Sequence, residues 1–278
     1  MVVWGKETAG TTVTVSMVGN SAAAVAAADG KWIATLAALK ANSGPHEITI
    51  KGSSTIKISD VLVGEVWVCS GQSNMQWPVR SANDGQLEAL AAKFPRIRLI
   101  TVTNEVGTQE AQDNFEGKWE AVSPETVLQF SAVGYFFGRQ LHQTLNVPIG
   151  LIECAGGGSA CEAWIPRDVL QKHGHAELLT HWDQLAEDYN AEAIEANFQK
   201  AVANWKQRAA AAKAAGKPNP PYPRRPRNSL AGQHRPDNLY QGVLNPIIGY
   251  AIQGAIWYQG ENNATQAKQY QDLFRVTQ

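Results

Sequence analysis

Closely spaced alternation of apolar and polar residues marks the first 60 residues as β-rich. Residues 46–51 and 55–58 alternate clearly, and residues 11–15 alternate more weakly. A further apolar-polar run at 32–36 follows an Asp29-Gly30 turn. Alternation with a period of two is typical of strands that have one buried face. Because no helical pattern separates these short strands, residues 1–60 are predicted to form a small β-sandwich domain.

Beyond residue 60 the pattern changes to buried strands that alternate with helices. An amphipathic pattern over 131–145 places Val133, Phe136 and Leu141 near one face of a helix, and Asn146-Val147-Pro148 ends it. The expected elements are strands at 61–69, 97–102, 149–153 and 252–258, and helices at 84–93 and 131–145. This alternation predicts an α/β fold with a mostly parallel sheet covered by helices, spanning 61–278.

An excursion of different composition interrupts this domain at about 166–235. Its first part is rich in Ala, Glu and Lys, and Pro166 suits a first helical turn. A polar helix over 201–217 is expected to end at Gly216. The following stretch, 217–227, is rich in proline and arginine, which favours an extended, solvated return over helix or central strand.

Composition bounds the function classes. The chain has 278 residues, a net charge of −1 and 44% hydrophobic residues. A sizeable core is therefore expected, and a nucleic-acid or membrane-surface partner is not. No run of about 18 apolar residues predicts a transmembrane helix. The start at Met1 does not have the pattern of a signal peptide, so we expect an intracellular protein or one whose signal is absent from this sequence.

The three cysteines do not predict a disulfide framework. Cys69 and Cys154 lie in apolar, strand-like runs, where cysteine behaves as a small buried hydrophobe. A bridge between Cys154 and Cys161 is the alternative, and it would indicate export. No Cys/His spacing typical of a zinc site occurs.

The candidate nucleophile is Ser73, in the stretch Ser70-Gly71-Gln72-Ser73-Asn74-Met75 that follows a buried strand. Open α/β sheets bind their ligands beyond the carboxyl ends of their strands. A serine on a turn that begins with glycine at such an end is therefore well placed to act on a ligand. The Gly-x-Ser-x-Gly signature of α/β-hydrolases is absent, because Met75 stands where its second glycine would be.

Two later segments each follow a predicted strand. Residues 156–159 read Gly-Gly-Gly-Ser, and consecutive glycines let backbone N–H groups approach an anion. Acyl transfer needs such donors for its oxyanion, although the same residues suit a flexible turn. The third segment, 257–263, contains Gln259, whose amide is a further candidate donor, and Glu261, which is placed to orient neighbours. Its alternative interpretation is a helix start capped by Asn262 or Asn263.

Together these three segments resemble the sialate O-acetylesterase family of SGNH-type hydrolases. The resemblance rests on residues 67–75, on Gly157-Gly158-Ser159 with Glu162-Ala163-Trp164 behind it, and on 257–264. Residues 61–65, 147–152, Leu239-Tyr240 and Asn245-Pro246 also fit, in family order. The resemblance implies an SGNH, flavodoxin-like three-layer parallel sheet preceded by a β-rich domain.

The resemblance also implies roles. Ser73 is the expected nucleophile, and its own N–H, a glycine N–H from Gly157 or Gly158, and the Gln259 side chain are the expected oxyanion donors. The implied reaction removes O-acetyl groups from a sugar through an acetyl-serine intermediate, with no metal or organic cofactor. Candidate substrate-binding residues are Asn74, Gln76, Trp77 and Glu261. Trp77 suits stacking on a sugar and packing in the core about equally, whereas Trp164 is expected in the core.

The motif that carries the family's general base does not occur in this sequence. The family supplies a histidine three residues after an aspartate, and no Asp-x-x-His occurs here. His234, which precedes the Tyr240 segment, is a weak candidate for the base. We therefore expect a sheet that is incomplete at its C-terminal end: a fragment of a longer enzyme, a chain completed by a second polypeptide that supplies the Asp/His pair, or a truncated protein that does not catalyse.

The substrate expectation keeps three alternatives. The leading one is an O-acetylated sialic acid, the second is acetylated xylan or a similar plant polysaccharide, and the third is glycan binding without catalysis. The family resemblance suggests a periplasmic or secreted location, with a cytoplasmic one as the alternative.

Overall fold

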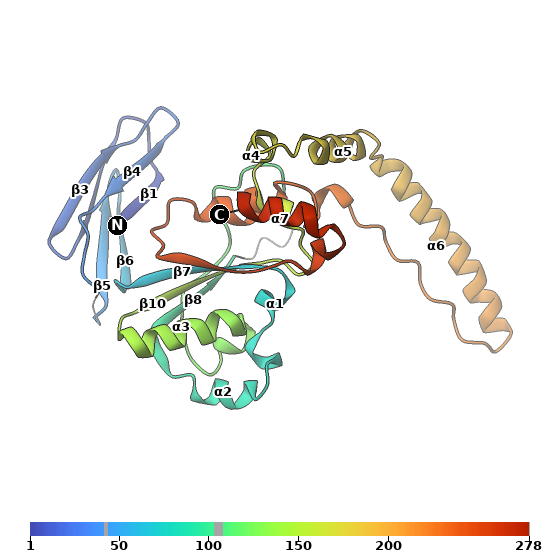
Figure 1. The fold of residues 1–278 in the computed structure, drawn as a ribbon, viewed down its shortest axis with the longest axis horizontal. Helices are drawn as coiled ribbons and strands as arrows, with labels where there is room; N and C mark the ends of the chain where they lie inside the picture. The colour runs from blue at the N-terminus through green and yellow to red at the C-terminus, as the bar shows by residue number, and fades with distance from the viewer. Residues whose placement is uncertain (42–43, 103–107, 278) are drawn as a thin grey trace.

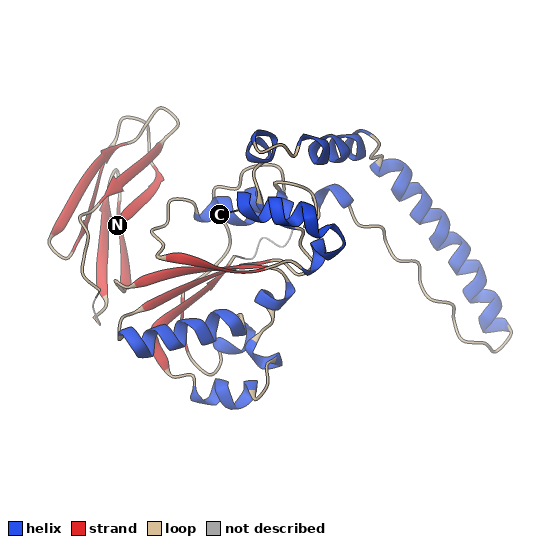
Figure 2. Cartoon of the chain, viewed as in Figure 1, coloured by secondary structure: helices blue, strands red, loops and turns tan. Residues whose placement is uncertain are grey.

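The computed structural model describes residues 1–41, 44–102 and 108–277. In Figure 1 an N-terminal group of strands lies beside a larger sheet with helices on both faces, and a long helix extends away from this body. The expected α/β class is confirmed, with strands gathered in the sheets that Figure 2 shows in red.

The N-terminal region contains two antiparallel sheets. A two-stranded sheet pairs β1 (Val2–Lys6) with β4 (Lys31–Thr35). A four-stranded sheet has the order β3-β2-β5-β6, formed by Asn20–Val25, Thr12–Met17, His46–Lys51 and Thr55–Val61. Both sheets contribute to one core, where Val15 from β2 packs with Trp32 from β4 and Ile48 from β5. This arrangement is the small sandwich that the alternating pattern predicts. The boundary at residue 60 stays a prediction.

The larger sheet has five strands in the order β11-β7-β10-β8-β9. They are β11 (Gly254–Tyr258), β7 (Glu65–Gly71), β10 (Ile149–Ala155), β8 (Phe94–Thr101) and β9 (Glu120–Val122). The first four are parallel, and β9 pairs antiparallel with β8. The first parallel strand along the chain thus lies between the third and the fourth. In flavodoxin it lies between the second and the third, so the layers agree with the expectation while the strand order differs from that of flavodoxin.

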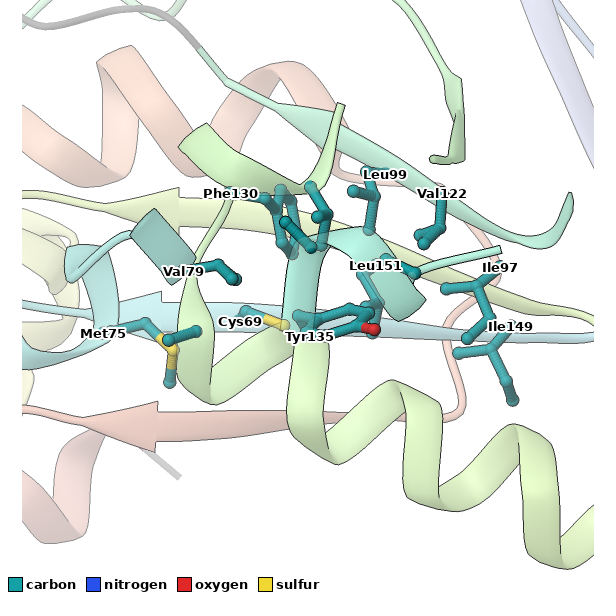
Figure 3. Close-up of a cluster of buried hydrophobic side chains, with 14 residues drawn as sticks. Cys69, Met75, Val79, Ile97, Leu99, Val122, Phe130, Tyr135, Ile149 and Leu151 are labelled. Carbon is teal, nitrogen blue, oxygen red and sulfur yellow. The ribbon is translucent and has the colours of Figure 1, made fainter. Parts of the chain in front are cut away.

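Helices cover the two faces of this sheet and make it a three-layer structure. On one face, α3 (Ala132–Leu145) and α2 (Gly85–Ala91) bury the cluster that Figure 3 shows, around Tyr135 and Leu151. On the other face, Trp164 and Val243 pack on Ile152. In Figure 1, α2 and α3 lie on the opposite side of the sheet from α7 (Ala267–Val276). The short turns are α1 (Ser73–Gln76), η1 (Val79–Ser81), η2 (Val127–Gln129), η3 (Cys161–Trp164), η4 (Ser229–Ala231), η5 (Tyr240–Leu244), η6 (Asn245–Ile247) and η7 (Glu261–Gln266).

The single strand expected at 61–69 is wrong, because β6 ends at Val61 and β7 begins at Glu65. A side chain at Gly64 would meet the Pro148 carbonyl oxygen at 2.0 Å, so the backbone passes Pro148 closely there. Val61 packs against the sandwich core, whereas Val68 belongs to the core of the larger sheet. One continuous apolar run therefore serves two cores, a distinction that periodicity alone does not reveal.

The helical excursion consists of α4 (Arg167–Lys172), α5 (Ala176–Glu187) and α6 (Ala191–Ala214). The last helix begins ten residues before the expected 201, because the Asn190 side chain caps it by accepting from Ala193 N at 2.8 Å. The proline-rich return has no helix or strand over 217–228, as expected. It is tied to α6 where Trp205 Nε1 donates to the Pro220 carbonyl at 2.8 Å.

Candidate active site

The carboxyl ends of β7 and β10 meet at a switch in direction of the chain. The connection that leaves β7 runs to the face covered by α2 and α3, whereas the connection that leaves β10 runs to the face covered by Trp164 and Val243. Adjacent parallel strands whose connections leave toward opposite faces open a crevice beyond their carboxyl ends. Ser73 and Gly157 both lie directly beyond those ends.

Gly71 lets the backbones of β7 and β11 approach closely at this point. Its φ is +142°, and a side chain there would meet the Tyr258 carbonyl oxygen at 2.2 Å. The next residue, Gln72, donates its backbone N–H to that same oxygen at 2.9 Å. The turn that presents Ser73 is therefore fixed to β11, a strand nearly 190 residues later in the chain.

Ser73 is exposed while its neighbours anchor the turn. Met75, two residues on, is 1% exposed and lies in the core beside Cys69, as Figure 3 shows. One turn of α1 therefore directs Met75 inward and Ser73 outward. Within the part of the chain that the structure describes, Ser73 Oγ has no hydrogen-bond partner. An exposed hydroxyl on an anchored turn is accessible to a substrate.

The glycine loop lies against this turn. Gly156 N–H donates to the Gly71 carbonyl at 3.0 Å. A side-chain carbon at Gly157 would lie 3.9 Å from Ser73 Cβ, so Gly157 faces the serine. A carbon at Gly158 would instead find Gln233 Nε2 at 3.6 Å. Of the two glycines proposed as oxyanion donors, the structure places Gly157 beside Ser73 and Gly158 toward the loop around Gln233.

The Gln259 side chain links two loops in this structure. Its Nε2 donates to the Ser159 carbonyl at 3.0 Å and to Asn263 Oδ1 at 2.9 Å. Its Oε1 is buried and has no partner among the described residues. Both amide N–H groups are thus engaged within the protein, and donation to an oxyanion at Ser73 stays a prediction that requires one of these contacts to exchange.

Two buried amides for which the sequence predicts no role in the site hold it together. Gln72, 3% exposed, accepts from Gly260 N–H at 3.0 Å and donates to Glu261 at 3.3 Å. Asn263, also 3% exposed, donates to Glu162 at 3.0 Å, while its Oδ1 accepts the Cys161 N–H. Asn263 is one of the two expected helix caps, but its side chain connects loops instead. Gln72 directly follows β7, and a polar residue at the end of an apolar strand is the sequence signal that could identify it.

The remaining candidates for sugar binding differ in exposure. Trp77 is 52% exposed, which leaves its ring available for stacking. Asn74 is partly exposed and Gln76 is exposed. Glu261 is exposed and accepts from Gln72. Trp164 is 4% exposed and donates to Ser159 Oγ at 3.0 Å, which confirms the expectation that it belongs to the core.

No histidine of the described chain bonds to Ser73 Oγ. His234 is exposed, and its Nε2 lies 2.7 Å from the Gly158 carbonyl oxygen, so it borders the glycine loop. His142 Nδ1 lies 2.6 Å from the Val147 carbonyl, at the end of α3. The weak sequence candidate, His234, is therefore near the loop without being placed as a base.

Burial controls the titratable groups beneath the site. Glu153 on β10 is 4% exposed, and burial raises the pKa of its carboxyl to about 7. Burial likewise raises the pKa of the Cys69 thiol to about 12. All three cysteines are free and buried, so the alternative bridge between Cys154 and Cys161 is wrong and the expectation of small buried hydrophobes is confirmed.

The described residues contain neither a cluster suited to a metal ion nor a membrane-spanning helix. Among them, no group of three or more His, Cys, Asp or Glu side chains is arranged to hold a metal ion. Of the helices described, none has the length and apolar character needed to span a membrane.

Comparisons with known proteins agree with this arrangement. The chain is 28% identical to sialate O-acetylesterase from Rattus norvegicus, over 95% of this chain and 49% of that protein. It is also 28% identical to sialate O-acetylesterase from Homo sapiens, over 94% of this chain and 45% of that protein. The chain spans about half the length of the curated relatives it matches.

The fold has a counterpart among solved structures. The crystal structure of a carbohydrate acetylesterase from Xanthomonas citri superposes with a TM-score of 0.73 and 28% sequence identity, over 100% of this chain and 52% of that chain. The sequence model of a carbohydrate esterase family, the sialic acid-specific acetylesterases, matches residues 63–207, more than half of the chain. The chain belongs to this family of sialic acid-specific carbohydrate acetylesterases.

Proposed function

We propose that the chain carries the nucleophile and an oxyanion donor of a carbohydrate O-acetylesterase. The observation that carries this proposal is the close approach of Gly157 to the exposed Ser73 at the crevice between β7 and β10. An acyl-transfer site needs a nucleophile and a backbone N–H on opposite sides of one small volume, and this geometry supplies both.

The reaction proceeds in two steps. Ser73 Oγ bonds to the acetyl carbonyl carbon while a base takes its proton, and the carbonyl oxygen becomes an oxyanion next to Gly157 N–H. The carbon–oxygen bond to the sugar then breaks, and the sugar oxygen takes the proton. Water hydrolyses the resulting acetyl-serine by the reverse sequence of proton transfers, which releases acetate.

The base is proposed to be a histidine of an Asp-x-x-His segment outside these 278 residues, on the same or a second polypeptide. Two observations support this source. The sequence contains no such segment, and Ser73 Oγ has no histidine partner among the described residues. His234 is the alternative within the chain, because it borders the glycine loop.

The proposed substrate is an O-acetylated sialic acid, with acetylated xylan as the alternative within the same chemistry. The half-exposed Trp77 ring suits stacking on a sugar, and Asn74, Gln76 and Glu261 offer polar groups around it. Comparing acetate release from 9-O-acetylated sialic acid and from acetylated xylan separates the two. Retention of a glycan by the protein without acetate release indicates binding alone.

The test of the mechanism is hydrolysis of p-nitrophenyl acetate by the protein and by Ser73→Ala, each assayed with the Asp-x-x-His segment present on the same or a second polypeptide. We expect the substitution to lower kcat/KM by roughly 10³-fold or more, because it removes the covalent route. Ser81→Ala, an exposed serine eight residues on, serves as the control and keeps the parent rate. Equal hydrolysis by the parent and Ser73→Ala, with the Asp-x-x-His segment present, contradicts the proposal.

A further inference from the structure

The backbone N–H of Gly157, the glycine that lies beside Ser73, is already engaged. It donates to Gln76 Oε1 at 2.9 Å. A carbon added at Gly157 would lie 2.9 Å from that oxygen and 3.9 Å from Ser73 Cβ, so the Gln76 oxygen and Ser73 lie on the same side of the glycine. The amide oxygen of Gln76 therefore stands where the carbonyl oxygen of a bound ester would have to be.

The path of the chain fixes Gln76 in reach of this position. Gln76 is three residues after Ser73, so both side chains leave the same face of the single turn of α1. Its backbone N–H donates to the Gln72 carbonyl at 3.0 Å, and the buried Met75 anchors the turn from below. The backbone is fixed while the Gln76 side chain itself is exposed.

Charge decides which acceptor the Gly157 N–H prefers. An amide oxygen and an ester carbonyl oxygen are both neutral acceptors, so exchanging one for the other changes the free energy little. An oxyanion forms a charge-assisted bond that is roughly twice as strong as a neutral one. Displacement of Gln76 costs the ester complex and the oxyanion the same free energy, so it raises KM and leaves kcat unchanged, while the stronger bond to the oxyanion still favours the transition state.

We infer that Gln76 gates the oxyanion position: its side-chain oxygen occupies the Gly157 donor in the free protein and leaves when the acyl group binds. This inference rests on the proposed function, because it assigns Gly157 as the donor. Gln76 then acts through Gly157 as a positioning residue that keeps the donor satisfied and controls access to it.

The test compares two nearly isosteric variants of the full chain. Gln76→Glu places a charged acceptor on the same N–H, and kcat/KM for p-nitrophenyl acetate at pH 7.5 is expected to fall about tenfold. Gln76→Met keeps the length and removes the acceptor. Because p-nitrophenyl acetate has no sugar for Gln76 to contact, the kcat/KM of this variant is expected to exceed that of the parent. Gln86→Glu, on the exposed face of α2, controls for the added charge and leaves the rate unchanged.

A pH profile distinguishes gating from a structural contact. The ratio of Gln76→Glu to parent activity is expected to rise toward one as the pH falls through the carboxyl's ordinary pKa of about 4.3, because protonation removes the charged acceptor. His234 and Glu261 on the neighbouring loops are present in both proteins and cancel in the ratio. An equal or lower kcat/KM in Gln76→Met, or parent activity in Gln76→Glu at pH 7.5, contradicts the inference that Gln76 gates the oxyanion position.

The amide resonance of Gly157 separates this inference from the proposed function. In ¹⁵N-labelled protein we expect it to move in opposite directions in Gln76→Met and Gln76→Glu, whatever the activity. An unmoved resonance overturns the gate while the Ser73 test stands. A moved resonance, with equal hydrolysis by the parent chain and Ser73→Ala, overturns the proposed function and with it the catalytic part of the gate.

Discussion

Glu153 Oε2 accepts a hydrogen bond from the backbone N–H of Ser131 at 3.3 Å, within the buried centre of the larger sheet. Ser131 caps α3 through its own side chain. The next residue, Ala132, donates its N–H to the Trp77 carbonyl at 2.8 Å. A buried acid on β10 thus supports the segment that follows the Ser73 turn, and its protonation affects that support.

This buried carboxyl is expected to make stability depend on pH. Because its folded pKa, about 7, lies above the ordinary value of 4.5, the folded state holds the proton where the unfolded state has lost it. The free energy of unfolding should therefore fall as the pH rises from 4.5 to 7 and stay level above, by an amount on the order of 3 kcal/mol. Urea denaturation at pH 5 and pH 8 measures it.

Glu153→Gln is the matched control for that pH dependence, since it keeps the shape and has no charge. We expect it to lose most of the decrease between pH 5 and pH 8. The same decrease in Glu153→Gln as in the parent would assign the effect to other groups.

Gly71→Ala should destabilise the protein by roughly 3 kcal/mol or more, because the new carbon meets the Tyr258 carbonyl at 2.2 Å and φ is +142°. Gly174→Ala is the control, with φ of +85° and no atom within 4 Å, and should cost only about 1 kcal/mol. Thermal or urea unfolding gives both values. Equal costs would show that β11 does not approach Gly71 as described.

Trp77→Ala and Trp164→Ala should separate substrate contact from packing. Trp77 is 52% exposed, so its loss should change stability by less than about 1 kcal/mol and raise KM for an acetylated sugar but not for p-nitrophenyl acetate. Trp164 is 4% exposed, and its loss should cost about 3–5 kcal/mol. A KM for the sugar that is unchanged in Trp77→Ala would remove Trp77 from the proposed substrate site.

Asn263→Ala should cost about 2–4 kcal/mol, since it leaves Glu162 and the Cys161 N–H buried without their partner. The neighbouring Asn262 is exposed, and Asn262→Ala should stay within about 0.5 kcal/mol of the parent. Denaturant unfolding of the two variants gives the comparison. Similar small effects in both would mean that the Asn263 contacts contribute little.

The cysteines should resist alkylation in the folded protein. Burial raises the pKa of Cys69 and of Cys161 to about 12 each, and raises that of Cys154 as well, so few thiolates exist at pH 8. Mass spectrometry after iodoacetamide treatment should find no adduct in buffer and three adducts in denaturant. Rapid labelling of the native protein would contradict the burial of these thiols.

Much of the architecture was readable from local patterns. The alternation at 46–51 reappears as β5, and the amphipathic run at 131–145 as α3, because each pattern has one face that must be buried. The single strand at 61–69 failed because adjoining apolar residues belong to two cores. The short strand β9 was not predicted, since three residues carry too little pattern to recognise.

Part of the candidate site could likewise be predicted from the sequence, and part could not. Ser73, the glycine loop and the 257–263 segment were found because each follows an apolar strand and carries residues suited to acyl transfer. The engagement of Gln259 with Ser159 and Asn263, and of Gly157 with Gln76, was not predicted. A side-chain amide has several rotamers, and only the packed neighbours select one.

By itself, the sequence determined which residue types follow each strand, and hence the kind of chemistry the chain carries. The tertiary structure alone decided which of them meet: β7 lies between β10 and β11, so Ser73 faces Gly157 while Gly158 faces another loop. The physical reason is that hydrophobic periodicity shows only which face of a helix or strand is buried. The partners across the sheet depend on strand order and on close backbone contacts such as Gly71 with Tyr258, which are set by residues nearly 190 positions apart.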